Sequence, residues 1–352
     1  SRGVGTPVER GSKGGAGVGP RQEVGPFLEP WPGSPGNCRS AFIDTHTPGS
    51  ELKDNFSIIG PGVTENAEQV VNIREPHGFN IGAAGQPPRI KNSLHSHFTA
   101  EVFMIHEGTF EIYWGLDSEC RTILSEGDVV SIPTRCFRGF ENVGEQYGFL
   151  FTVLGGDDTG GVEWAPKVFE AAEEHGLVLL EEHGVWDTHK APIPEGARRV
   201  KVMSQEEASD YDTYTEAEME QRISRVANLV PQTDTPLSSG SYGSIGHLRI
   251  IGLDESVIPG GDGFEMNLMT ADQGGGVQMH SRKEKEVLIC DCGSWKIEWK
   301  EKGESGFFVL EKGDLFSLPP DLPRTFESIG VNPGRLYSVI NKDAPSSPSW
   351  HA

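Results

Sequence analysis

A sparse set of residues recurs along this chain of 352 residues at a nearly constant offset. The offset is 185 positions from His95 to His280 and 186 positions from Arg138 to Arg324, so one single-residue slip separates the two measurements. A repeat of this length indicates duplication of one structural unit, and the chain should therefore contain two similar domains. The matched pairs are His95 and His280, Glu101 and Glu286, Gly108 and Gly293, Gly127 and Gly313, Pro133 and Pro319, and Arg138 and Arg324.

Both halves consist of short apolar runs separated by turn residues. The chain contains 45 Gly and 24 Pro, and 36% of its residues are hydrophobic, which is typical of a turn-rich β protein with a sizeable core. Runs of this length, spaced about 8–12 residues apart, predict a sandwich or barrel. In the first half they lie at 58–59, 70–73, 79–81, 102–105, 110–114, 121–132 and 147–154.

The region between the two halves has a different pattern. Pro at position 166 and Gly at position 176 predict a helix that ends near His175. Capping-box patterns follow at Ser204-x-x-Glu207 and Thr215-x-x-Glu218, and the second predicts a helix that continues to about Leu229. This region should form a partly helical connector.

These patterns divide the chain into five expected parts. They are a flexible arm at 1–36, rich in Gly, Pro and Ser, an N-terminal barrel with a metal site at 37–155, the helical connector at 156–240, a C-terminal barrel with a degenerate site at 241–342, and a tail at 343–352.

Metal-ligating residue types cluster in the first half. His95 and His97 are two positions apart, and alternate side chains of a strand point the same way. A short bend would then bring Glu101 to the same point. Two imidazoles and one carboxylate, with coordination positions left open, form a set that non-heme Fe(II) prefers. The competing interpretation is a solvated strand end.

The spacing of these residues resembles the first motif of the cupins, which reads His-x-His, three or four residues, Glu, six residues, Gly. The second cupin motif is matched in spacing, with Arg in two places where Gly and His are usual. With its duplication the chain is similar to a bicupin over residues 55–155 and 245–342, which implies two double-stranded β-helix (jelly-roll) barrels. The matching residues are His95, His97, Glu101 and Gly108, then Gly127, Pro133, Arg135, Arg138 and Asn142.

Arg138 stands where the family's fourth metal ligand would be His. A guanidinium stays protonated and cannot ligate a metal. Arg138 is therefore predicted either to form a salt bridge with Glu101 or Glu141, or to face the open side of the metal. In the second case it would be catalytic and substrate-binding, by pairing with a substrate carboxylate or by stabilising an anionic oxygen. Arg135, on a turn, is the weaker candidate.

The second half lacks one of the three ligands, because Arg282 stands where the first half has His97. Only His280 and Glu286 remain. Two ligands rarely hold a divalent metal against water, so the second barrel is predicted to be metal-free and to supply structure and interface.

Alternate positions along the strands predict roles for other residues of the first barrel. Phe103 and Phe151 are predicted substrate-binding residues on an apolar cavity wall, although both also suit a core. His106 should point away from the face of Glu101. Among the scattered histidines, His77 is the first to examine as a further member of the site.

The resemblance implies three classes of function. The first is a non-heme Fe(II) oxygenase acting on a small hydroxylated aromatic or unsaturated acid, similar to the gentisate and quercetin dioxygenases. The second is a metal-dependent isomerase or lyase acting on a sugar acid or keto acid. The third is a non-catalytic binding or storage bicupin. Fe(II) is the expected cofactor, with Mn, Ni, Co, Cu or Zn as alternatives.

Composition restricts the partners. The formal net charge is −22, which argues against binding to nucleic acid or an anionic membrane. No apolar run reaches the ~18 residues of a membrane span. Five cysteines, an odd number, indicate free thiols and a cytoplasmic location. A small-molecule substrate and a homo-oligomer are the expected partners.

Overall fold

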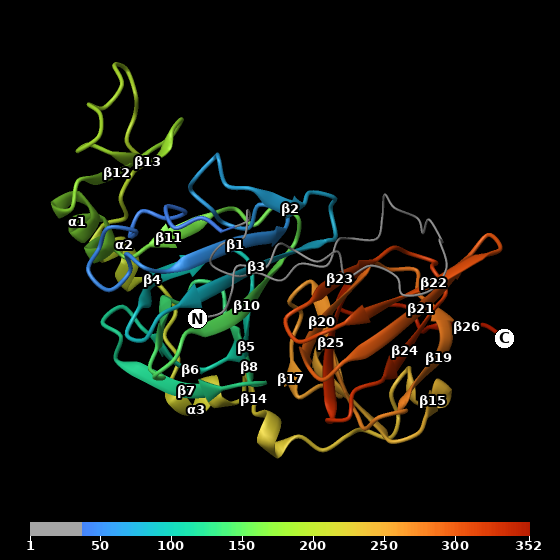
Figure 1. Cartoon of the computed structure of the whole chain (residues 1–352). Helices are drawn as coiled ribbons and strands as arrows, with labels where there is room; N and C mark the ends of the chain where they lie inside the picture. Colours follow the sequence, from blue (N-terminus) through green and yellow to red (C-terminus); the bar gives the residue numbers. More distant parts are fainter. Residues whose placement is uncertain (1–36) are drawn as a thin grey trace. The chain divides into compact units, whose positions relative to one another are not determined.

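The computed structural model describes residues 37–352, and the arm expected at 1–36 lies outside this range. The described chain divides into two compact units. One unit contains residues 37–229 with 250–264, and the other contains 230–249 with 265–352. Strands dominate both units (Figure 1), so the expectation of a mainly β protein is confirmed.

Two facing sheets build the N-terminal barrel. One has seven strands in the order β14-β8-β5-β10-β3-β1-β2, and the other has five in the order β11-β4-β9-β6-β7. The strands are β1 (Asp54–Ile59), β2 (Val71–Ile73), β3 (Phe79–Gln86), β4 (Lys91–His97), β5 (Glu101–Glu107), β6 (Thr109–Trp114), β7 (Cys120–Ser125), β8 (Val129–Ile132), β9 (Arg138–Asn142), β10 (Gly148–Gly155), β11 (Val162–Trp164) and β14 (Ile223–Ser224).

The core of this barrel lies between the two sheets. Phe103 on β5 and Phe140 on β9 come from opposite sheets, and their ring centroids are 5.1 Å apart. They belong to one buried cluster with Phe110 and Ile112 of β6. Burial of these large apolar side chains, worth about 25 cal/mol per Å², holds the sheets together. The barrel predicted from strand spacing is confirmed.

The C-terminal barrel repeats this arrangement. Its sheets have the orders β15-β19-β24-β21-β22, with β26 also on β19, and β17-β16-β18-β25-β20-β23. The strands are β15 (Ser241–Tyr242), β16 (Ile245–Gly252), β17 (Ile258–Pro259), β18 (Phe264–Ala271), β19 (Gly276–Ser281), β20 (Glu286–Cys292), β21 (Trp295–Glu301), β22 (Glu304–Leu310), β23 (Leu315–Leu318), β24 (Arg324–Ser328), β25 (Gly334–Asn341) and β26 (Ser349–Trp350).

The strand pairings confirm the internal duplication and lengthen it. His95 pairs with Arg138, and His280 pairs with Arg324 in the same register. Trp164 pairs with His95, and Trp350 pairs with His280. The repeat therefore reaches Trp350, within the segment that was expected to be a tail.

The middle region is less helical than predicted. The helix α1 (Pro166–Glu174) forms where it was expected. Both capping boxes also form, and each opens a short helix, but the second helix ends at Glu220 rather than near Leu229. The remaining elements are α2 (Gln205–Ser209), α3 (Glu216–Glu220), η1 (Val226–Asn228), η2 (Ser238–Gly240) and a hairpin of β12 (Leu177–Leu180) and β13 (Gly184–Asp187).

The early end of α3 has a clear cause. Ile223 and Ser224 form β14, which pairs with β8 at the edge of the seven-stranded sheet. The Arg222 Nε atom also donates to the Ser131 carbonyl at 2.7 Å. An exposed strand edge offers unpaired backbone groups, and here it captures the segment that would have continued the helix.

All five cysteines lie among the described residues and carry free thiols, as predicted. Within residues 37–352, no helix is long and apolar enough to cross a membrane.

Candidate metal centre

Both sheets of the N-terminal barrel contribute to one cluster of side chains. His95 and His97 are two positions apart on β4, so both project from the same face of the five-stranded sheet. Glu101 opens β5 in the facing sheet. The bend at 98–100 carries the chain from one sheet to the other and places the carboxylate opposite the imidazoles, as the sequence predicted.

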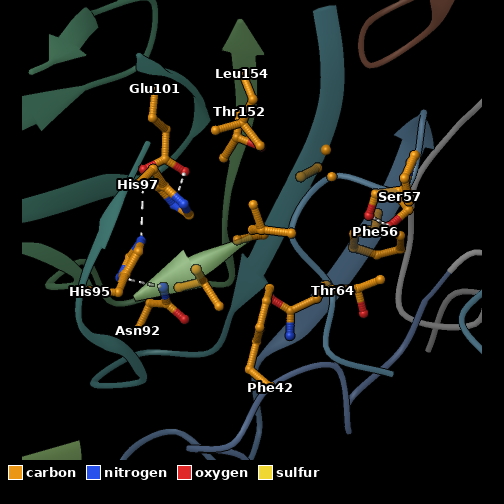
Figure 2. Close-up of a pocket in the computed structure, with 18 of the residues that line it drawn as sticks. Phe42, Phe56, Ser57, Thr64, Asn92, His95, His97, Glu101, Thr152 and Leu154 are labelled. Carbon is orange, nitrogen blue, oxygen red and sulfur yellow. Dashed lines mark hydrogen bonds and ion pairs between the residues drawn. The ribbon is translucent and has the colours of Figure 1, made fainter. Parts of the chain in front are cut away.

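The three side chains converge at short range. His95 Nε2 lies 3.7 Å from Glu101 Oε2, and His97 Nε2 lies 3.4 Å from Glu101 Oε1. The three candidate ligand atoms all lie within 4.8 Å of one another. Their residues are only 3%, 1% and 4% exposed. Figure 2 shows the three side chains pointing toward one another at one end of a cavity.

Backbone carbonyls fix the tautomers of both imidazoles. His95 Nδ1 lies 2.7 Å from the Ser93 carbonyl, and His97 Nδ1 lies 3.2 Å from the Gly161 carbonyl. A carbonyl oxygen only accepts hydrogen bonds, so each Nδ1 carries the proton and each Nε2 presents a lone pair. This is the arrangement in which a histidine ligates through Nε2 while its other nitrogen is held by an outer partner.

The donors fit a divalent metal ion. The His97 Nε2 atom is buried and has no hydrogen-bond partner in the described part of the chain. Two imidazole lone pairs and a carboxylate facing one another repel, and a cation between them would remove that repulsion. With metal–ligand bonds of ~2.1 Å, neighbouring ligand atoms on one ion lie ~3 Å apart, so the observed separations need only small adjustments. The set offers three ligands and leaves positions open.

Electrostatics keeps His95 and Glu101 in their ligating forms near neutral pH. Burial lowers the pKa of His95 to about 4, partly offset by Glu101, so its imidazole is neutral. Burial alone would raise the pKa of Glu101. Arg138, whose guanidinium adjoins the carboxylate, is among the groups that more than offset this and hold the pKa of Glu101 well below its usual value.

Arg138 forms one of the two predicted salt bridges. Its Nε donates to Glu101 Oε2 at 3.0 Å, and its Nη1 donates to the Cys136 carbonyl at 2.9 Å. The side chain is fully buried, and none of the described residues forms a hydrogen bond with its Nη2 atom. Arg138 is absent from the lining of the cavity described next, so contact with a substrate remains a prediction.

A cavity of about 60 Å³ adjoins the three donors. Among the residues that the structure describes, the only titratable side chains in its lining are His95, His97 and Glu101 themselves. Neutral polar groups contribute part of the wall, namely Asn55, Ser57, Thr64, Gln69, Asn92 and Thr152. The apolar part includes Phe42, Phe56, Phe140, Leu154, Val162 and Trp164.

The two phenylalanines predicted to line the cavity do not border it. Phe103 packs deeper between the sheets, against Phe140. On β10 the cavity residues are Thr152 and Leu154, and because side chains alternate, Phe151 lies on the opposite face. The aromatic wall comes instead from residues outside the motifs, such as Phe42.

Two further histidines of the first barrel that the sequence singled out lie apart from the cluster. The ring centroid of His106 is 5.4 Å from that of Phe151, so His106 points away from the face of Glu101, as parity predicted. His77 is buried, with its Nδ1 2.6 Å from the Glu75 carbonyl, and it does not belong to the ligand group.

The sequence did not reveal the tryptophan beside the first histidine. The ring centroid of Trp164 is 5.5 Å from that of His95, and the Trp164 Nε1 donates to Glu65 Oε1 at 2.8 Å. Its counterpart Trp350 lies 5.6 Å from His280. Extending the 186-residue offset to the end of the chain would have found this pair.

Comparisons with known proteins support the fold. Residues 85–154, within the N-terminal barrel, match the family described as Cupin domain. No curated protein matches the chain. A Lactobacillus farciminis oxalate decarboxylase, solved as a formate complex, is similar with a TM-score of 0.50 and 14% identity, over 78% of this chain and 79% of that chain. A Bacillus subtilis oxalate decarboxylase, solved at pH 4.6, has a TM-score of 0.48 and 15% sequence identity, over 77% of this chain and 70% of that chain.

Proposed function

We propose that this two-barrel cupin protein is a metal-dependent enzyme acting on a small, oxygen-rich organic acid, with the metal held by His95, His97 and Glu101. The observation that carries the proposal is the buried convergence of two lone-pair Nε2 atoms and one carboxylate beside a cavity. Carbonyl contacts orient both imidazoles before any ligand arrives, which is the preorganisation that a metal centre needs.

The cavity limits the size of the substrate. Its volume is about 60 Å³. A cavity of ~150 Å³ is the size known to accommodate benzene. An aromatic acid, the class first expected from the sequence, would need the wall to open. Acids of two to about four carbons fit this constraint better, and a keto acid is among them.

The wall also indicates how such an acid binds. No cationic side chain among the described residues lines the cavity, so a carboxylate has no ion-pair partner there. We infer that the acid chelates the metal through two oxygens, while neutral donors such as Asn92, Ser57 and Thr64 orient it. When bound, the ion supplies Lewis-acid polarisation of the substrate oxygens. Fe(II) and Mn(II) both suit this ligand set.

The reaction that the site supports best is a lyase-type cleavage of a C–C bond, such as decarboxylation. Isomerisation would need a side chain to abstract a proton, and within residues 37–352 the cavity lining provides no carboxylate, imidazole or amine beyond the three proposed ligands. Loss of CO₂ needs no base to begin, and the carbon that keeps the electron pair of the broken C–C bond can take its proton from water. The similar Lactobacillus farciminis structure is an oxalate decarboxylase, which makes oxalate a reasonable first substrate to assay.

An oxygenase is the second candidate. Open positions at the proposed centre and an apolar wall that includes Phe42, Phe56 and Leu154 would accommodate dioxygen. Fe(II) held by two imidazoles and a carboxylate is the arrangement that uses it.

Oxygen dependence separates the two candidates. Protein loaded separately with Mn(II) and Fe(II) would be incubated with oxalate and with small keto acids, with and without oxygen, and CO₂ and oxygen measured together. Equal CO₂ release under strict anaerobiosis supports the lyase. Turnover that stops without oxygen and consumes it stoichiometrically supports the oxygenase. Absence of turnover with every metal and acid would contradict the enzymatic proposal.

A further inference from the structure

A buried lysine lies directly behind the cavity wall. Lys53 precedes β1 and is 0% exposed. Its ammonium forms an ion pair with Asp44 and donates to Asn92 Oδ1 at 2.6 Å. Its Nζ also lies 5.3 Å from the ring centroid of Phe42 and 5.8 Å from that of Trp164. Phe42, Asn92 and Trp164 all line the cavity, so only one layer of side chains separates the ammonium from it.

The ammonium dictates the orientation of the Asn92 amide. An ammonium only donates hydrogen bonds, so the amide oxygen must face Lys53 and the NH₂ group must face away from it. That NH₂ group lies 3.4 Å from His95 Nδ1, which already donates to the Ser93 carbonyl. Two donors cannot satisfy each other. The Asn92 NH₂ therefore remains available to an acceptor in the cavity, beside the first histidine (Figure 2).

The second barrel shows that this position has no fixed structural need for an amide. The offset of 185 residues matches Asn92 with Val277, and the register agrees, because Asn92 pairs with Phe140 as Val277 pairs with Phe326. The barrel that lacks the third metal-ligand residue thus has an apolar side chain here. An apolar residue fits this strand, and the amide occurs only where the complete donor set occurs.

We propose that Lys53 is a positioning residue that holds Asn92 as a neutral hydrogen-bond donor to an anionic oxygen of a ligand bound at the metal centre. This inference rests on the proposed metal site and deepens it by naming the ligand class, a carboxylate or similar oxyanion. Asp44 neutralises the ammonium, so the cavity presents a preorganised dipole in place of a free cation. A fixed donor of this kind adds affinity without the cost of desolvating an unpaired charge.

The test uses Co(II)-loaded full-length protein, whose visible spectrum reports on anion binding at the metal. Formate, oxalate and azide would be titrated separately into the wild type and into Asn92→Val, which imports the second-barrel residue. We expect at least one anion to bind the wild type. Asn92→Val should lower the affinity for that anion about tenfold or more, as loss of a hydrogen bond to a charged group predicts. Asn92→Asp, which replaces the donor by a carboxylate, should weaken it further.

A second variant isolates the role of Lys53. The double substitution Lys53→Met with Asp44→Asn removes the ion pair without leaving a buried carboxylate unpaired. It should lower the affinity for the anion several-fold while leaving Co(II) affinity and the anion-free spectrum unchanged. A merely structural role would instead change metal affinity and thermal stability. Asn66→Val, at an asparagine outside this cavity lining, is the matched control and should bind the anion as the wild type does.

The outcomes are distinguishable. Failure of the wild type to bind Co(II) would contradict the metal centre itself, and this inference with it. If Co(II) binds but none of the three anions does, the oxyanion assignment is wrong while the metal centre stands. If Asn92→Val binds the anion within twofold of the wild type, Asn92 is not the donor. If Asn92→Val loses the anion but the double variant binds it as the wild type does, Lys53 does not position Asn92.

Discussion

The two barrels of this protein share a scaffold and differ at the place where one of them gathers metal-ligand residues. In each, a histidine on the equivalent strand has its Nδ1 held by the carbonyl two residues earlier, at 2.7 Å in the first barrel and 2.8 Å in the second. In each, a tryptophan lies beside that histidine. Yet among the described residues only the first barrel brings three ligand-type side chains together.

The carboxylates show how the difference arises. In the first barrel each oxygen of Glu101 faces an imidazole, and Arg138 shares one of them. In the second barrel Arg324 donates to one oxygen of Glu286 and Ser338 donates to the other. Both oxygens are thus already engaged by protein donors.

The substitution of a histidine by Arg282 completes the change. Burial would raise the pKa of Glu286, but the charges of Arg324 and Arg282 bring it down to about 2. Protein cations thus stabilise in the second barrel the carboxylate that we propose a metal ion stabilises in the first. The comparison teaches that strand pairing and core packing maintain the barrel, while a few inward positions decide whether it gathers three metal-ligand residues.

The largest expected effect is from His97→Ala. It removes one of three proposed ligands, and a quarter share of the ~10–16 kcal/mol of a four-ligand site corresponds to about 10²-fold or more in metal affinity. The purified protein should contain essentially no metal and show no turnover. The matched control is His280→Ala in the second barrel, which should retain both. Full metal content and rate in His97→Ala would make the ligand assignment wrong.

Arg282→His should convert the second barrel toward the first. It recreates the sequence His-x-His with the glutamate four residues later, and the His280 Nε2 atom is already buried without a partner. We expect a second metal ion per chain, bound more weakly because Ser338 and Arg324 still engage Glu286. Elemental analysis after equilibration with Mn(II) measures this. If the number of metal ions per chain does not change even when Ser338→Ala is added, the comparison is contradicted.

Arg138→Met should shift the pH dependence of metal binding. Glu101 must be ionised to ligate, and Arg138 is among the groups that lower its pKa. Lowering that pKa preserves the ligating form as pH falls, so removing the guanidinium should raise the pH at which acid releases the metal, by about one unit. Metal content measured from pH 7 to pH 3 tests this. An unchanged or lowered midpoint would show that Arg138 does not support the ionised carboxylate.

The smallest expected effect is from Phe103→Leu, which imports the second-barrel residue Leu288. Because Phe103 packs between the sheets rather than on the cavity wall, we expect a loss of about 1 kcal/mol in the free energy of unfolding. Urea denaturation would measure that loss, and the KM for the substrate should not change. A several-fold change in KM would return Phe103 to the binding site.

Much of this architecture follows from sequence patterns that act locally. The offset between the two halves predicted two similar barrels. The two-residue spacing of His95 and His97 predicted the donor cluster. The short α3 could not be predicted, because capture of Ile223 by the edge of β8 depends on a strand distant in sequence. Phe42 on the cavity wall and Lys53 behind it were missed for a similar reason, since both lie before the motifs and reach the site only through folding.

Crystals of the protein equilibrated with Mn(II) and measured with X-rays that give a strong Mn anomalous signal provide the most direct test of the central claim. One anomalous peak per chain is expected, within bonding distance of His95 Nε2, His97 Nε2 and a carboxylate oxygen of Glu101. No peak there, or a peak of equal height beside His280 and Glu286, would contradict the assignment of the metal to the first barrel alone.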